Sequence, residues 1–215
     1  MNNYQLKTNN LELKTEIMAY DKFEILKSTA VPLPIENVDT DQIIPARFLK
    51  ATERKGFGDN LFRDWRYNPD NTIKEEFVLN NPIYKGKILV GGKNFGSGSS
   101  REHAAWAVYD YGFRCVVSSF FADIFRGNCL NIGVLPVQVS VAFLDKIYKA
   151  IEADPTTELE INLQNQTITL LVSGDKESFD INDYKKDNML NGYDDIDYLT
   201  KMKEEITEFA SKRPF

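Results

Sequence analysis

A short apolar run, a loop rich in glycine and serine, and the start of a helical pattern follow one another near the middle of this chain. The apolar run is Ile88–Val90, the loop is Gly92–Ser100, and Arg101 comes in the first helical turn. The free N–H groups and the dipole of a helix N-terminus attract anions. Gly96 and Gly98 let the backbone approach a ligand closely. The pattern therefore indicates a site for a small acid, with the guanidinium of Arg101 as a partner for its carboxylate.

Three well-known loop motifs do not fit this segment. A P-loop needs a lysine at the helix start, a dinucleotide fingerprint needs a third glycine, and in a nucleophile elbow Gly98 would have to be serine. A simpler interpretation is a helix capped by Ser99 or Ser100, with Glu102 closing a capping box from Ser99. The spacing alone leaves the anion site and simple capping both open.

Phe95–Ala104 reads F-G-S-G-S-S-R-E-H-A, and further segments accompany it along the chain. They are Asn37–Pro45, Gly56–Gly58, Leu61–Arg66, Asp110–Gly112, Ser119–Phe125, Gly133–Val137, Asn188–Gly192 and Lys212–Phe215. In their order along the chain, these segments resemble those of the small subunits of 3-isopropylmalate dehydratase. The resemblance runs from about Tyr20 to the last residue. The swivelling domain of aconitase carries a close variant of the loop.

The resemblance implies a fold, an activity and a partner. The fold is α/β, the layered β/β/α architecture of the aconitase swivel domain, over residues 20–215. The activity is that of a hydro-lyase of leucine biosynthesis, which interconverts 2-isopropylmalate and 3-isopropylmalate through a dehydrated intermediate. The partner is a large subunit that bears a 4Fe–4S cluster and forms a heterodimer with this chain. The chain alone is expected to be inactive.

The resemblance also assigns the catalytic base. A serine is a poor base unless backbone N–H groups, a helix dipole and a guanidinium stabilise its alkoxide. Ser99 matches the serine that acts as base in aconitase, and Arg101 matches the arginine that grips a substrate carboxylate. Gly98 and Ser100 are expected to contact substrate beside them.

Two more residues are expected to bind substrate on the same basis. Asp41 matches an acid next to the aconitase active site and could position an arginine, although a turn aspartate is an equally simple interpretation. Arg54 lies in the segment where relatives place a substrate-recognising loop.

Other functions remain open at this point. Ser99 and His103 are four residues apart on one helical pattern, so a hydrolase-type pair with Asp39 or Asp41 as third member is conceivable. A sister enzyme acting on homoaconitate or a methylmalate-type acid is the nearest alternative, and an RNA-binding module is a more distant one. The net charge of −6 and the pI near 5.0 disfavour a nucleic-acid surface.

The composition also limits the compartment and the cofactor. No apolar run approaches the roughly 20 residues that span a bilayer, and the polar N-terminus lacks a signal-peptide core, so we expect a cytoplasmic protein. Residues 1–19 are expected to be a disordered extension.

Cys115 and Cys129 are the only cysteines and lie among apolar residues, which is typical of buried free thiols. Two thiols cannot hold an iron–sulfur cluster alone, and with one histidine no zinc site is expected.

Periodicity predicts a mixed fold of alternating strands and helices in the middle and a β-hairpin late in the chain. Pro32 and Pro34 are expected to end the first strand, and the segment 50–82 shows no clear period. The strands are expected at 23–31, 88–90, 115–118, 134–139, 158–163 and 167–172, and the helices at 100–111, 121–131, 141–153, 183–191 and 195–212.

Overall fold

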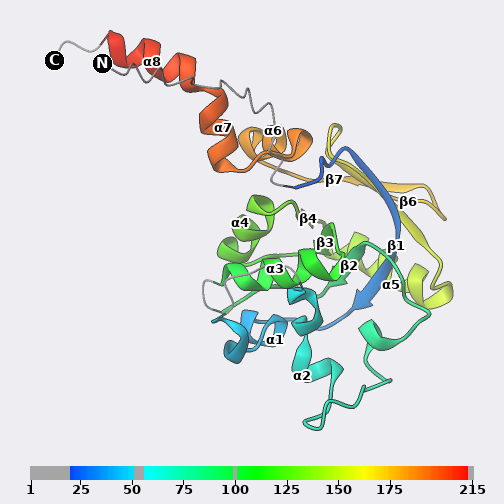
Figure 1. Ribbon diagram of the computed structural model, residues 1–215. Coiled ribbons are helices and arrows are strands. Elements are labelled where there is room, and N and C mark those ends of the chain that lie inside the picture. Colours follow the sequence, from blue (N-terminus) through cyan, green and yellow to red (C-terminus); the bar gives the residue numbers. More distant parts are fainter. Residues whose placement is uncertain (1–19, 51–55, 99–100, 213–215) are drawn as a thin grey trace, which may run out of the picture.

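A computed structural model describes residues 20–50, 56–98 and 101–212 of the chain (Figure 1). Within these ranges seven strands form one sheet in the order β4-β3-β2-β1-β5-β6-β7. The strands are β1 (Ile25–Leu33), β2 (Ile88–Gly91), β3 (Cys115–Ser118), β4 (Leu135–Gln138), β5 (Glu158–Asn162), β6 (Thr167–Leu170) and β7 (Asp175–Ser178). Strands β1 to β4 run parallel, and β1 pairs antiparallel with β5 on its other side.

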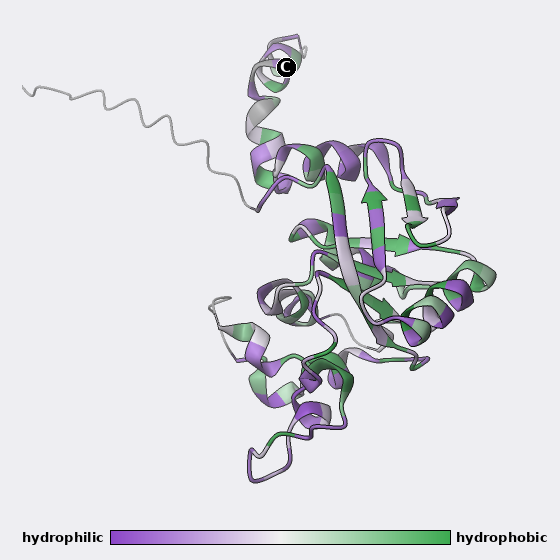
Figure 2. Cartoon of the chain, turned by 90° about the vertical axis from the view of Figure 1, so that its right-hand side faces the viewer, coloured by the Kyte–Doolittle hydropathy of each residue, from purple (hydrophilic) through white to green (hydrophobic). Residues whose placement is uncertain are grey.

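The parallel half is the most deeply buried part of the sheet. Every residue of β2 and β3 is buried, and Figure 2 shows strands inside the body largely in the green of hydrophobic residues. Such continuous apolar runs are typical of strands covered on both faces. Strand β1 does not end at Pro32, as the sequence predicted, but continues to Leu33. Its pairing with β5 stops at Thr29, so Pro32 has a strand neighbour only in β2, and its missing N–H disrupts no ladder with β5.

The antiparallel half reads differently. In β5 and β6 buried and partly exposed residues alternate, which is the pattern of strands with one covered face. Both strands were predicted as a hairpin, and the structure confirms it. Strand β7 was not predicted, because Asp175–Ser178 is polar and shows no alternation of apolar residues.

Helices and the antiparallel strands cover the two faces of the parallel half. Ile88 and Val90 pack into a core that also contains α5 (Val141–Ala153) and the buried residues of β5 and β6. Leu89 points to the opposite core, where α3 (Glu102–Tyr111) and α4 (Asp123–Asn131) lie. The arrangement confirms the predicted layered β/β/α fold.

The segment between β1 and β2 folds over α3 as a series of short elements. They are α1 (Thr40–Ile43), η1 (Ala46–Phe48), η2 (Phe57–Asn60), α2 (Arg63–Arg66) and η3 (Val78–Asn80). The N–H of Gly58 donates to the carboxylate of Asp110 on α3 at 2.7 Å. Arg66 is buried, and its guanidinium lies 4.8 Å from the ring centre of Tyr111. These contacts join sequence blocks that lie far apart in the chain.

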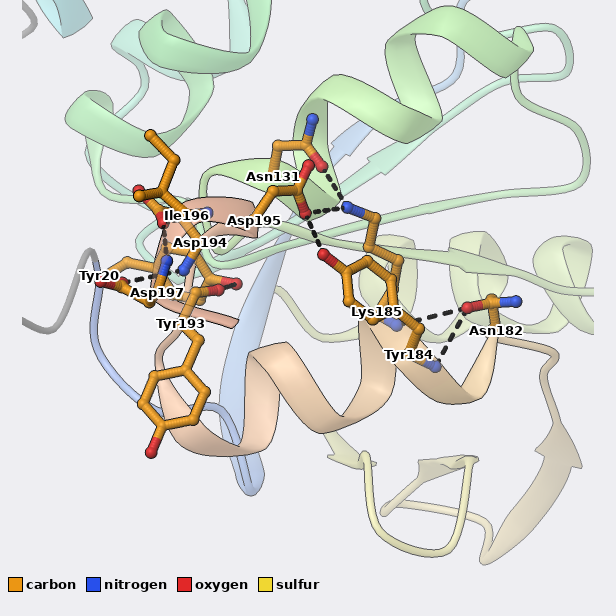
Figure 3. A network of polar contacts seen from close by, with 10 residues as sticks. All are labelled: Tyr20, Asn131, Asn182, Tyr184, Lys185, Tyr193, Asp194, Asp195, Ile196 and Asp197. Carbon is orange, nitrogen blue, oxygen red and sulfur yellow. Dashed lines mark hydrogen bonds and ion pairs between the residues drawn. The ribbon is translucent and has the colours of Figure 1, made fainter. Parts of the chain in front are cut away.

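Three helices end the described part of the chain: α6 (Asp183–Asn191), α7 (Asp195–Lys201) and α8 (Lys203–Ser211). The sequence predicted α7 and α8 as one helix, but the helix is interrupted at Met202. Figure 3 shows the polar contacts at their base, where Lys185 bonds Asn131 at 2.8 Å and Asp195 at 2.6 Å. Figure 1 shows α7 and α8 projecting from the body. None of the helices formed by the described residues combines the length and apolar character that crossing a bilayer requires.

Candidate functional site

The loops that follow β1, β2 and β3 meet at the carboxyl ends of these parallel strands. The N–H of Gly96, after β2, donates to the carbonyl of Val38 at 2.7 Å. The N–H of Phe95 donates to the carbonyl of Phe120, after β3, at 3.0 Å. Ligands of open α/β sheets bind outside the carboxyl ends of the strands, so this junction is the expected place for a site.

Gly96 and Gly98 hold the loop in a conformation that other residues would resist. Their φ angles are +78° and +100°, in the region that L side chains rarely adopt. A Cβ built on Gly96 would lie 2.2 Å from the ring of Phe125, which packs beneath the loop against Phe95. The close approach of loop and ring therefore requires glycine at this position.

Arg101 and Asp41 form an ion pair across the end of this loop. Asp41 is in the first turn of α1, and the side chain of Asp39 caps that helix in a capping box with Gln42. The N–H of Thr40 donates to the carbonyl of Ser97 at 2.8 Å, so α1 lies directly against the loop. The Arg101 side chain is 17% exposed and that of Asp41 is 54% exposed, so an anion can still approach the pair from solvent.

Arg101 differs in detail from the sequence prediction. It was expected in the first helical turn, but it is the N-cap of α3, with an extended backbone and no side-chain cap bond. Its guanidinium is therefore directed to Asp41 rather than to the helix backbone.

Three of the predicted site residues, Ser99, Ser100 and Arg54, lie outside the described residues. Their roles as base and substrate contacts stay predictions, as does the alternative pairing of Ser99 with His103. Gly98 and Arg101, which flank this pair in the sequence, are both described.

A hollow of about 510 Å³ lies beside Arg101, lined by Leu49, Arg101, Glu102, His103 and Asn128. The His103 ring is 4.4 Å from the Trp106 ring and 5.7 Å from the Phe57 ring, centre to centre. Leu49 and Asn128 were not predicted. Leu49 directly follows η1 and Asn128 lies on α4, so only the tertiary fold brings them to Arg101.

A larger hollow of about 690 Å³ lies in the segment between β1 and β2, where Arg47 pairs with Asp64. None of the predicted site residues within the described ranges lines it. The chemistry of the loop, rather than the size of the hollow, therefore selects the candidate site.

The two cysteines are free and completely buried, as predicted. Burial raises the pKa of both the Cys115 and the Cys129 thiol well above the ordinary value, so neither forms a thiolate near neutral pH. Among the described residues no group of three or more His, Cys, Asp and Glu side chains could hold a metal ion. These residues do not fit an iron–sulfur cluster.

Known proteins are similar in sequence to this chain over most of its length. Residues 20–142 match the family model of the aconitase C-terminal domain, and residues 145–183 match the model LeuD_N. The 3-isopropylmalate dehydratase small subunit of Cytophaga hutchinsonii is 64% identical over 88% of this chain and 94% of its own length. This chain belongs to the family of 3-isopropylmalate dehydratase small subunits.

Two further comparisons agree with this family. The 3-isopropylmalate dehydratase small subunit of Christiangramia forsetii is 60% identical over 90% of this chain and 94% of its own length. A crystal structure of 3-isopropylmalate dehydratase from Methanocaldococcus jannaschii matches with a TM-score of 0.63 and 24% identity, covering 86% of this chain and 98% of that chain. At this identity the structural match supports the fold alone.

Proposed function

We propose that this chain is the small subunit of a 3-isopropylmalate dehydratase, a hydro-lyase of leucine biosynthesis. The enzyme isomerises 2-isopropylmalate to 3-isopropylmalate by removing water and adding it back. The observation that carries this proposal is the pairing of Arg101 with Asp41 at the end of a glycine-rich loop, in a chain whose relatives bear that name.

The substrate carries two carboxylates, and Arg101 is the group that suits one of them. A guanidinium offers two parallel N–H donors to a carboxylate. Asp41 holds the guanidinium beside the loop before substrate arrives, which reduces the entropy lost on binding. Gly98, Ser100 and Arg54 supply further substrate contacts in this proposal.

Ser99 acts as the base. Its alkoxide takes a proton from the carbon next to a carboxylate, and the hydroxyl group on the neighbouring carbon leaves as hydroxide. In the reverse addition hydroxide adds to the carbon that lost the proton, and Ser99 gives its proton to the carbon that lost the hydroxyl group. The N-terminus of α3 and the guanidinium of Arg101 stabilise the negative charge that Ser99 carries before it takes the proton.

A large subunit completes the enzyme. The two buried thiols of this chain do not fit a 4Fe–4S cluster, so in this proposal the large subunit holds the cluster. When bound, that group supplies Lewis-acid chemistry at the substrate hydroxyl. We place the complex in the cytoplasm.

The test combines this chain with the large subunit of the same organism under anaerobic conditions and follows the absorbance of the unsaturated intermediate. Activity is expected only in the mixture. Ser99→Ala should abolish it, and Arg101→Lys should raise KM at least tenfold because one of the two parallel donors is lost. Lys146→Gln, on α5 and paired with Asp175, is the matched control and should change neither value.

Three outcomes would contradict the proposal or parts of it. Turnover by this chain alone would remove the need for a large subunit. Full activity of Ser99→Ala would remove the assigned base. Turnover of a different hydroxy acid in place of isopropylmalate would make the protein a sister enzyme.

A further inference from the structure

Three large apolar side chains on the segments that follow β1 and β3, next to the glycine-rich loop, face solvent. Ile35 is 40% exposed, Phe120 47% and Ile124 52%. Exposed apolar residues are common singly, but several around one site mark an interaction surface. Phe120 and Ile124 also belong to the segment Ser119–Phe125, one of the blocks that carry the family resemblance, and nothing in the site chemistry requires them to be apolar.

Ile35 and Phe120 lie on opposite sides of the glycine-rich loop. Ile35 follows β1, and its carbonyl oxygen would be 2.4 Å from a Cβ on Gly92, so it packs against the start of the loop. Phe120 follows β3, and its carbonyl accepts the N–H of Phe95 at 3.0 Å. Because β2 lies between β1 and β3 in the sheet, its loop lies between the two segments that carry Ile35 and Phe120.

Ile124 lies on the same helix as Asn128, one of the residues that line the hollow beside Arg101. It is one helical turn before Asn128 on α4, so the two side chains share a face of that helix. Asn128 lines the hollow together with Arg101, whereas Phe125 on the inner side of α4 packs under the loop. Ile124 is therefore an exposed apolar residue on the face of α4 that also carries Asn128.

We propose that Ile35, Phe120 and Ile124 form an apolar seat on which the large subunit docks. This rests on the proposed function, in which a second chain must bring its cluster to a substrate held by Arg101. A chain that approaches the loop and the hollow from solvent meets the exposed surface on which these residues lie. A second copy of this chain fits less well, because it would bring a second Arg101 toward the first and would add no new chemical group.

The seat separates docking from chemistry. None of its three residues carries a group that could bind a proton or a carboxylate, so it contributes through burial of apolar surface alone. Buried aromatic and aliphatic side chains near the centre of an interface often contribute most of the affinity, which is consistent with Phe120 next to the loop.

The test measures binding of the cluster-loaded large subunit to Phe120→Asp and Ile124→Asp by sedimentation velocity or interferometry. Val172→Asp is the matched control, because Val172 is 70% exposed in the turn before β7, in the antiparallel half of the sheet. Both seat variants should bind at least tenfold more weakly, and the control should bind like the unchanged chain. Excess large subunit should restore the turnover number of both seat variants.

The outcomes distinguish the two proposals. If the unchanged chain does not bind the large subunit, the proposed function fails. If it binds and both seat variants bind within twofold of it, the seat is wrong. A dimer of this chain alone that Ile124→Asp dissolves would assign the surface to a second copy instead. Ile124→Ser, which adds no charge, serves as a milder variant at the same position. Thermal melts of every variant show whether weaker binding results from unfolding of this chain.

Discussion

The two halves of the sheet share one strand and have different tasks. In the parallel half, β2 and β3 are buried on both faces, and the loop after β2 carries Gly96, Gly98 and Arg101. In the antiparallel half, β5 and β6 are buried on one face only, and none of the predicted site residues lies on them. The comparison indicates that the antiparallel half supports the core, whereas the parallel half positions the candidate site.

The largest expected effect on stability comes from a glycine substitution, compared between one glycine in each half of the sheet. Gly96→Ala and Gly174→Ala both place a side chain at positive φ, +78° and +75°, which costs roughly 1–2 kcal/mol. Only at Gly96 would the Cβ also meet a ring, that of Phe125 at 2.2 Å, whereas nothing lies within 4 Å at Gly174. With overpacking added, we expect Gly96→Ala to lower the free energy of unfolding by about 4 kcal/mol and Gly174→Ala by about 1 kcal/mol.

Urea unfolding followed by circular dichroism measures both values. If the two variants lose equal free energy of unfolding, the loop does not pack closely on the ring of Phe125.

A core substitution in the antiparallel half should affect stability without affecting catalysis. Ile161 is completely buried in β5. Ile161→Ala should lower the free energy of unfolding by about 3 kcal/mol, because the deletion leaves a cavity. The turnover number per folded molecule in the assembled enzyme should not change. A matching loss of turnover, measured after correcting for the folded fraction, would contradict the division of tasks between the halves.

The smallest expected effect concerns two exposed ion pairs. The Arg47 guanidinium donates to Asp64 and lowers the pKa of that carboxyl from 3.8, and Lys146 does the same for Asp175 with help from Ser173. A lowered folded pKa stabilises the protein above the unfolded pKa, and this contribution is lost as the pH falls through the folded value.

Because both carboxylates are exposed, solvent screens the pairs. Asp64→Asn should lower the free energy of unfolding at pH 7 by no more than about 0.5 kcal/mol. The difference between Asp64→Asn and the unchanged chain should vanish at the acid end of a pH series of thermal melts. A difference that grows toward low pH would contradict the sign of this argument.

Elements with strong local signals could be predicted from the sequence. Helix α5 begins after Ser140, whose side chain accepts the N–H of Phe143, and its apolar residues recur at helical spacing. Helix α6 lies between the N-cap Asn182 and the C-cap Gly192, which has positive φ. Both helices have the predicted bounds.

Elements without such local signals could not be predicted. Strand β7 is polar and forms because the turn after β6 brings it alongside that strand. At the site, the loop residues were predicted because they are contiguous in the chain. Leu49 and Asn128 join them only through the packing of η1 and α4 around Arg101, which no local pattern encodes.

The position of β1 between the two halves has a consequence for folding during translation. This strand is made early, and its partner β2 follows after the long segment that covers α3. Its other neighbour is made much later, since Leu26 pairs with Ile161 of β5. Contacts between such distant parts of a chain form slowly. One edge of β1 therefore stays unpaired until most of the protein has left the ribosome, and the nascent chain is open to wrong pairing throughout that interval.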